Sequence, residues 1–156
     1  MADIHIEEFY KDTAVALVQL YNAFPRRVNL FVEDIAGPDE PDEFGLHSRR
    51  HMACFGSLLW MAEEGLIRYV DTIRQEALDQ AVLSQRAFTR LSAPASPTLV
   101  ASVEPHVIAG GESLPPSVRA DLTTHVHIIR ETLRTGHSAK LSHVMQEIFF
   151  RDEPDH

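Results

Sequence analysis

The sequence predicts a mostly helical α+β protein with one small antiparallel hairpin and two helices at its C-terminal end. Three observations support this class. Several segments repeat apolar residues at helical spacing, and two short runs of strand character flank a polar stretch after the third such segment. The 156 residues are 44% hydrophobic and 24% charged, which suits a globular chain that buries its own core.

The first helix is expected over residues 5–24. Its apolar side recurs at steps of three and four residues: Phe9, Thr13, Ala16, Leu17, Leu20 and Phe24. Such steps keep one face of a helix apolar. Pro25 ends the helix, because a proline disfavours helical geometry in the residue before it.

Only short elements fit between residues 28 and 46. Residues 28–30 suit a short strand and residues 30–35 a short helix, which Gly37 closes. Residues 38–43 hold two prolines and four carboxylates, a composition that continues no regular element. We expect an acidic loop there.

A longer helix is expected over residues 47–64. Its inward stripe is expected to be Met52, Phe55, Leu58, Leu59 and Ala62. Gly65 follows at the point where a left-handed helix end favours glycine.

A hairpin and a short helix should follow Gly65. Residues 66–70 alternate like a half-buried strand, residues 71–79 form a polar excursion, and residues 81–83 suit the returning strand. Ser84 can cap a helix that runs to Leu91.

The remaining chain predicts a linker and a helical extension. We expect a domain over residues 1–92, a linker over 93–116, an extension over 117–150 that packs on the same core, and a frayed tail over 151–156. Residues 99–103 within the linker fit either an extended or a helical segment. One amphipathic helix, ended by Gly136, is marked by Val118, Leu122, Val126, Ile129 and Leu133. A last helix, capped by Ser138, turns Leu141, Val144, Met145 and Ile148 inward.

One motif resembles a known superfamily. Residues 58–69 read Leu-Leu-Trp-Met-Ala-Glu-Glu-Gly-Leu-Ile-Arg-Tyr, and residues 82–91 read Val-Leu-Ser-Gln-Arg-Ala-Phe-Thr-Arg-Leu. A leucine-rich helix that ends in Gly-Leu-Ile before a strand resembles winged helix-turn-helix domains, over about residues 5–92. The resemblance implies a winged-helix-like domain with a small β-wing, and a regulatory function.

The resemblance implies duplex DNA as one partner. The helix over residues 47–64 would then enter the major groove, with Arg49 and Arg50 at base edges and Arg68 and Arg74 flanking the wing. The net charge of −9 opposes a polyanionic partner. Residues 1–46 carry 3 basic and 10 acidic side chains, whereas residues 47–93 carry 6 and 5, so a DNA surface would lie in this middle part.

The alternative is a protein-interaction or dimerisation module that does not bind DNA. Ser57 and Trp60 lie away from the expected core stripe and Met61 lies at its side, and small residues beside a tryptophan suit close packing against another helix or a second subunit. These residues and the acidic loop would form the partner surface. A homo-oligomer or a protein partner is therefore the second expectation.

Metal binding and catalysis receive little support. His47, His51 and Cys54 share one helix flank, and imidazole with thiolate is zinc chemistry, but a solvated helix start is the stronger interpretation and no cofactor is expected. The sequence holds no P-loop, dinucleotide fingerprint or nucleophile elbow, so no enzyme is expected. A single cysteine, no readable signal peptide and no long apolar run favour a cytoplasmic protein without a membrane span.

Overall fold

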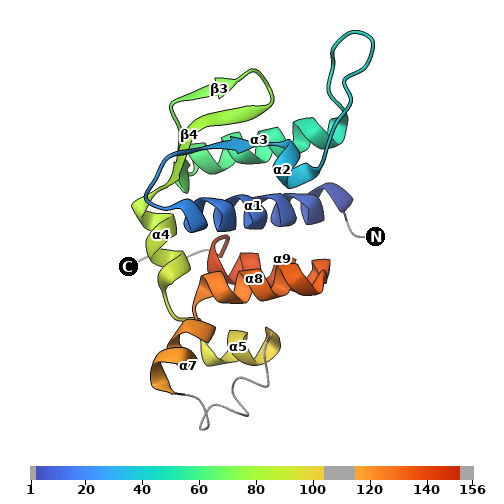
Figure 1. Ribbon diagram of the computed structural model, residues 1–156. Helices are drawn as coiled ribbons and strands as arrows, with labels where there is room; N and C mark the ends of the chain where they lie inside the picture. Colours follow the sequence, from blue (N-terminus) through green and yellow to red (C-terminus); the bar gives the residue numbers. More distant parts are fainter. Residues whose placement is uncertain (1–2, 104–114, 152–156) are drawn as a thin grey trace. The chain divides into compact units, whose positions relative to one another are not determined.

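The computed structural model describes residues 3–103 and 115–151, without the side chains of residues 119–121. Its contacts divide the chain into two compact units, Met1–Phe88 and Thr89–His156 (Figure 1). Helices dominate and one small sheet is antiparallel, so the predicted mostly helical α+β class is confirmed. The division falls within the helix expected to end at Leu91. That residues 117–150 pack on the core of the first unit stays a prediction.

The first unit is built around two long helices. Its helices are α1 (Ile4–Ala23), α2 (Glu33–Ala36) and α3 (Arg49–Glu63). Helices α1 and α3 pack against each other, and α2 contacts both. The apolar positions predicted for α1 supply buried residues, and α3 adds its own: Ala16, Leu17, Leu20, Phe55, Leu58 and Met61.

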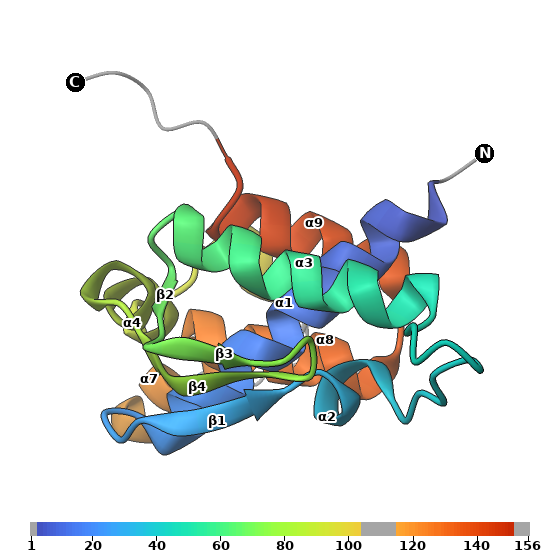
Figure 2. The same cartoon turned by 90° about the horizontal axis from the view of Figure 1, so that it is seen from above.

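A small antiparallel sheet completes this unit. Its strands are β1 (Val28–Phe31), β2 (Ile67–Arg68), β3 (Asp71–Ile73) and β4 (Ala77–Leu83). Strand β4 pairs with each of the other three, and Figure 2 shows it between β1 and β3. The predicted polar excursion over residues 71–79 is wrong in part. It contains β3, whose ladder hydrogen bonds do not require an apolar sequence, and the start of β4, where Ala77 and Leu78 are buried.

Two local predictions around the sheet are confirmed. Gly65 has a φ of 76°, the left-handed conformation expected at the end of α3. The two residues after it, Leu66 and Ile67, are buried. Ser84 accepts a hydrogen bond from the Ala87 N–H at 3.2 Å and so caps α4 (Gln85–Ser92) as expected.

The second unit contains four short helices among the described residues. They are α5 (Pro97–Val103), α7 (Pro116–Leu122), α8 (His125–Thr135) and α9 (Ser138–Ile148). Helix α8 contacts the other three. Its predicted end is confirmed, because Gly136 has a φ of 74°. The alternative left open for residues 99–103 resolves as helix.

The prediction of a single helix between Val118 and Leu133 is wrong, because the helix is interrupted between α7 and α8. The Thr123 carbonyl accepts a hydrogen bond from the Ala95 N–H at 2.7 Å, and the His125 N–H donates to the Ala93 carbonyl at 3.0 Å. These contacts with residues far away in the sequence replace hydrogen bonds that a continuous helix would make. The apolar residues keep their helical spacing across this interruption, so the sequence pattern does not reveal it.

Parts of the predicted linker and tail, residues 104–114 and 152–156, lie outside the described residues. Within the described ranges, none of the helices combines the length and the apolar character that a membrane span requires.

Candidate functional site

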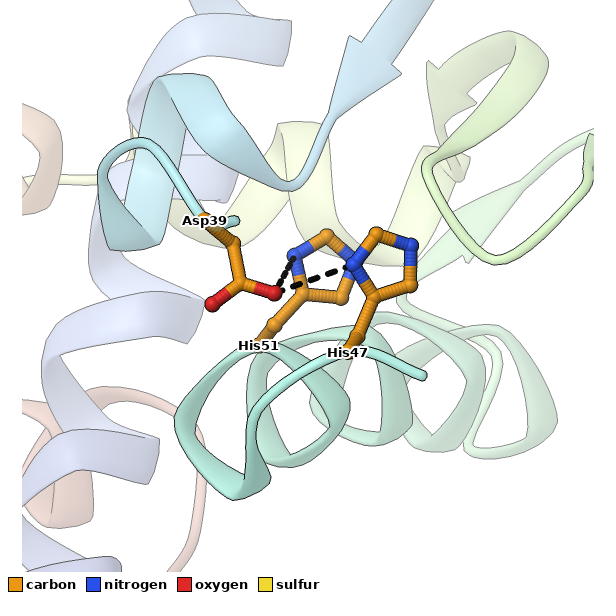
Figure 3. Close-up of side chains that lie close together, drawn as sticks. All are labelled: Asp39, His47 and His51. Atoms are coloured by element: carbon orange, nitrogen blue, oxygen red, sulfur yellow. Dashed lines mark hydrogen bonds and ion pairs between the residues drawn. The ribbon is translucent and has the colours of Figure 1, made fainter. Parts of the chain in front are cut away.

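The residues just before α3, the first turn of α3 and the acidic loop meet at the N-terminal end of this helix. Ser48 is the N-cap, and its hydroxyl accepts a hydrogen bond from the His51 N–H at 3.2 Å. This cap holds His47, just before the helix, and His51, in its first turn, with their rings stacked 3.8 Å apart. The third segment is the acidic loop, which brings Asp39 against both rings (Figure 3).

Asp39 faces the same nitrogen of both imidazoles. Its Oδ2 lies 3.0 Å from Nδ1 of His47 and 3.9 Å from Nδ1 of His51. One donor atom from each residue lies within 4.8 Å of the other two. Two imidazole nitrogens and a carboxylate oxygen form a donor set that divalent transition metals use.

The second ring nitrogen of His51 fixes the orientation of its imidazole. Nε2 lies 2.7 Å from the Gln75 carbonyl oxygen, which can only accept, so Nε2 carries a hydrogen. In the neutral ring Nδ1 then presents a lone pair. The His51 residue is only 4% exposed, and its Nδ1 has no hydrogen-bond partner among the described atoms. The buried Nδ1 therefore faces the Asp39 carboxylate without a hydrogen bond.

Asp39 is ionised at neutral pH. Hydrogen bonds from the side chain and backbone N–H of Ser48, and then from His47, lower the pKa of its carboxyl to about 2. The other ring nitrogen of His47, Nε2, lies 3.9 Å from Oε1 of Glu76 in the β3–β4 turn. The site thus joins the acidic loop, the start of α3 and the β3–β4 turn.

Cys54 lies outside this cluster, although the sequence grouped it with the two histidines. Its thiol is fully buried. Burial, followed by the negative charge of Asp12, raises the pKa of Cys54 to about 12. The residue that joins the histidines is Asp39, which sequence spacing does not distinguish from its neighbours Glu40, Asp42 and Glu43.

The four predicted DNA-contacting arginines have different environments. Arg49, Arg68 and Arg74 are exposed. Arg50 instead forms two hydrogen bonds with Asp12 of α1, a residue that is 1% exposed. Two of its guanidinium nitrogens are therefore engaged by Asp12, although 30% of the side chain stays exposed. Asp12, in the middle of an apolar helix, is the sequence signal that identifies this pair.

The predicted partner surface is also divided. Met61 and Ser57 are buried, so neither of these two predicted surface residues is open to a partner. Trp60 is 38% exposed and meets the ring of Phe9 edge to face, with centroids 5.2 Å apart. A shallow hollow of about 400 Å³ adjoins it, lined by His5, Phe9, Ala53, Gly56, Ser57 and Trp60.

Comparison with protein-family models finds no family that matches the chain. Comparisons with curated proteins and with solved structures find no match either.

Proposed function

We propose that the chain is a winged-helix-like, non-enzymatic interaction module that forms a homodimer through the outer face of α3. The order α1, β1, α2, α3 and an antiparallel hairpin supports the winged-helix part. Gly65 at the turn into β2, with Leu66 and Ile67 buried behind it, also matches the resemblance.

The outer face of α3 carries the dimer proposal. Residues on it recur at alternating steps of four and three, the spacing of helices that pack lengthwise against each other. The stripe is Arg49, Ala53, Gly56, Trp60 and Glu63. Small residues at its centre let two backbones approach closely, and an aromatic anchor such as Trp60 is typical of an interface core.

The charged ends of the stripe are complementary to each other. Gly56 lies midway between Arg49 and Glu63. If two copies of α3 cross antiparallel at Gly56, Arg49 of one copy lies opposite Glu63 of the second. Trp60 and Ala53 then lie opposite Met52 and Leu59, half-buried apolar residues that flank the stripe. A two-fold interface repeats each contact twice, so two charge pairs close the ends of one apolar seam. The partner that fits this face is therefore a second copy of this chain.

DNA is the second candidate, favoured by the exposure of Arg49, Arg68 and Arg74. Two features weigh against it. Arg50 is engaged by Asp12, and the outer face of α3 ends in the acidic pair Glu63 and Glu64. The two functions compete, because both require Arg49.

Light scattering on charge-reversed variants tests the dimer. Arg49→Glu and Glu63→Arg each place like charges at both ends of the seam, so each variant is expected to be monomeric. The double variant restores opposite charges and should restore the dimer. Trp60→Ala should weaken dimerisation by about tenfold or more.

Arg68→Glu, outside the seam, is the matched control and should remain dimeric. A monomeric wild type, or a dimer that every variant retains, would contradict the proposal. Fluorescence anisotropy with duplex DNA across a salt series separates the second candidate. Affinity that falls steeply with salt and weakens in Arg49→Ala favours DNA.

A further inference from the structure

We propose that Asp39, His47 and His51 bind a zinc ion through Oδ2, Nδ1 and Nδ1 at the N-terminal end of α3. Sequence spacing had suggested Cys54 as the third ligand, and the structure replaces it with a carboxylate from the acidic loop. This inference does not depend on the proposed dimer.

The orientation of His51 is the first argument. Gln75 fixes a hydrogen on Nε2, and the other ring nitrogen, Nδ1, is buried without a hydrogen-bond partner among the described atoms, 3.9 Å from the Asp39 carboxylate. A buried Nδ1 that faces a carboxylate is satisfied by a metal ion between the two atoms or by a proton on Nδ1. The separation of 3.9 Å is too long for the hydrogen bond that the proton would make, and it leaves room for a metal ion. A backbone carbonyl on the far nitrogen is also the usual outer partner of a metal-bound histidine.

The spacing of the donor atoms is the second argument. Ligand atoms on one tetrahedral zinc lie about 3.3 Å apart, as follows from bonds of about 2.0–2.1 Å. The distances from Asp39 Oδ2 to the two Nδ1 atoms, 3.0 Å and 3.9 Å, are close to that value. The two imidazole rings are stacked with their planes 9° apart, so one ring must turn before both Nδ1 lone pairs reach a single ion. The ring of His47 can make this turn at the edge of the site, where 11% of its side chain is exposed.

His47 can adopt the state that a metal requires. In the absence of metal its Nδ1 hydrogen lies toward Asp39. Metal binding needs that nitrogen deprotonated, and the hydrogen then resides on Nε2, where Glu76 lies 3.9 Å away. The Gln75 carbonyl orients His51 through a hydrogen bond, whereas Glu76, at 3.9 Å from Nε2 of His47, attracts that N–H only through its charge.

The donor set favours zinc over a hard cation. Magnesium and calcium prefer oxygen ligands alone, whereas two imidazoles with one carboxylate suit zinc. Three protein ligands leave one position for water, and partly exposed ligands allow exchange. The ion would connect the acidic loop directly to the start of α3 and, through the Gln75 carbonyl and Glu76, to the β3–β4 turn.

Calorimetric titration of the chelator-treated, untagged chain with zinc chloride at neutral pH tests the site. One zinc per chain is expected, together with a higher melting temperature that a chelator reverses. Asp39→Asn and His47→Ala should each weaken binding by at least about 100-fold. Glu76→Gln should weaken it by about tenfold. A large excess of magnesium should not compete.

Two matched controls locate the ion. Cys54→Ala and the exposed His143→Ala should bind zinc as the wild type does, and circular dichroism should show that each variant is folded. No zinc binding by the wild type would overturn the proposal. Stoichiometric binding that survives both Asp39→Asn and His47→Ala, or that Cys54→Ala abolishes, would overturn it as well.

Discussion

Arg50 of α3 binds Asp12 of α1 through two guanidinium nitrogens. Nη1 lies 2.6 Å from Oδ2 and Nη2 lies 2.5 Å from Oδ1. The hydrogen bonds with Asp12 raise the pKa of Arg50 above its ordinary value. Because Asp12 is almost completely buried, the pair explains why an acidic residue lies among the apolar positions of α1.

The two residues of this pair should differ in their effect on stability. Arg50→Ala leaves a carboxylate buried without its counterion, so we expect a loss of about 3 kcal/mol in the free energy of unfolding. Asp12→Ala leaves a guanidinium that is partly exposed and lies 3.8 Å from Glu8, so the loss should be about 1–2 kcal/mol. Urea unfolding of both variants measures the difference.

Arg49→Ala is the control for this comparison, because Arg49 is exposed and should change stability by less than about 0.5 kcal/mol. Equal losses in Arg49→Ala and Arg50→Ala would contradict the assigned role of the pair. The control also matters for any DNA experiment, since a loss of binding in Arg50→Ala would reflect unfolding as well as contact.

Two glycines of the first unit should respond oppositely to alanine. Gly65 has a φ of 76°, and nothing lies within 4 Å of the place where a Cβ would stand, so Gly65→Ala introduces backbone strain alone and should cost about 1 kcal/mol. Gly56 is helical and equally open, so Gly56→Ala should stabilise the monomer by about 0.5–1 kcal/mol. Thermal unfolding at low protein concentration measures both, and a destabilised Gly56→Ala monomer would contradict this assignment.

The sequence indicated most helices because burial repeats with the helical period. It missed β3, since that strand is short, polar and paired on one side with β4. Its pairing depends on backbone hydrogen bonds, which leave little trace in side-chain pattern. The break before α8 was missed for the converse reason, because distant backbone partners override a continuous apolar stripe.

The candidate site was found in part. The spacing of His47 and His51 by four residues brought them together correctly, because one turn of chain separates them. Asp39 could not be selected from the acidic loop, since a loop of irregular path has no period. The sequence predicts that Arg50 projects away from the core, because helical geometry gives the direction of a side chain but not its partner on another helix.

Cys54 should be inert in the folded protein. Burial and the charge of Asp12 raise its pKa from 9.0 to about 12, so the thiol stays protonated where an unfolded thiol ionises. We expect no reaction with a thiol-specific disulfide reagent at mildly alkaline pH until denaturant is added. Rapid stoichiometric reaction of the native protein would contradict this prediction.

The same shift predicts a pH dependence of stability. The pKa of Cys54 is higher in the folded protein than in the unfolded chain. The contribution of its protonated thiol to the free energy of unfolding is therefore complete below pH 9.0 and is lost as pH rises from 9.0 toward 12. Cys54→Ala removes the titrating group. Stability of the wild type should therefore fall more steeply above pH 9 than that of the variant, as followed by urea unfolding across the alkaline range.

Thr124 should control the start of α8. Its hydroxyl accepts a hydrogen bond from the His127 N–H at 3.4 Å, and its backbone forms a bridge with Pro94. Thr124→Ala removes the cap and should cost about 1 kcal/mol, whereas Thr124→Ser keeps the hydroxyl and should cost little. Thermal unfolding followed by circular dichroism compares the two. If α7 and α8 instead formed one continuous helix, Thr124 would be an interior position and alanine, the better helix former, would raise the melting temperature.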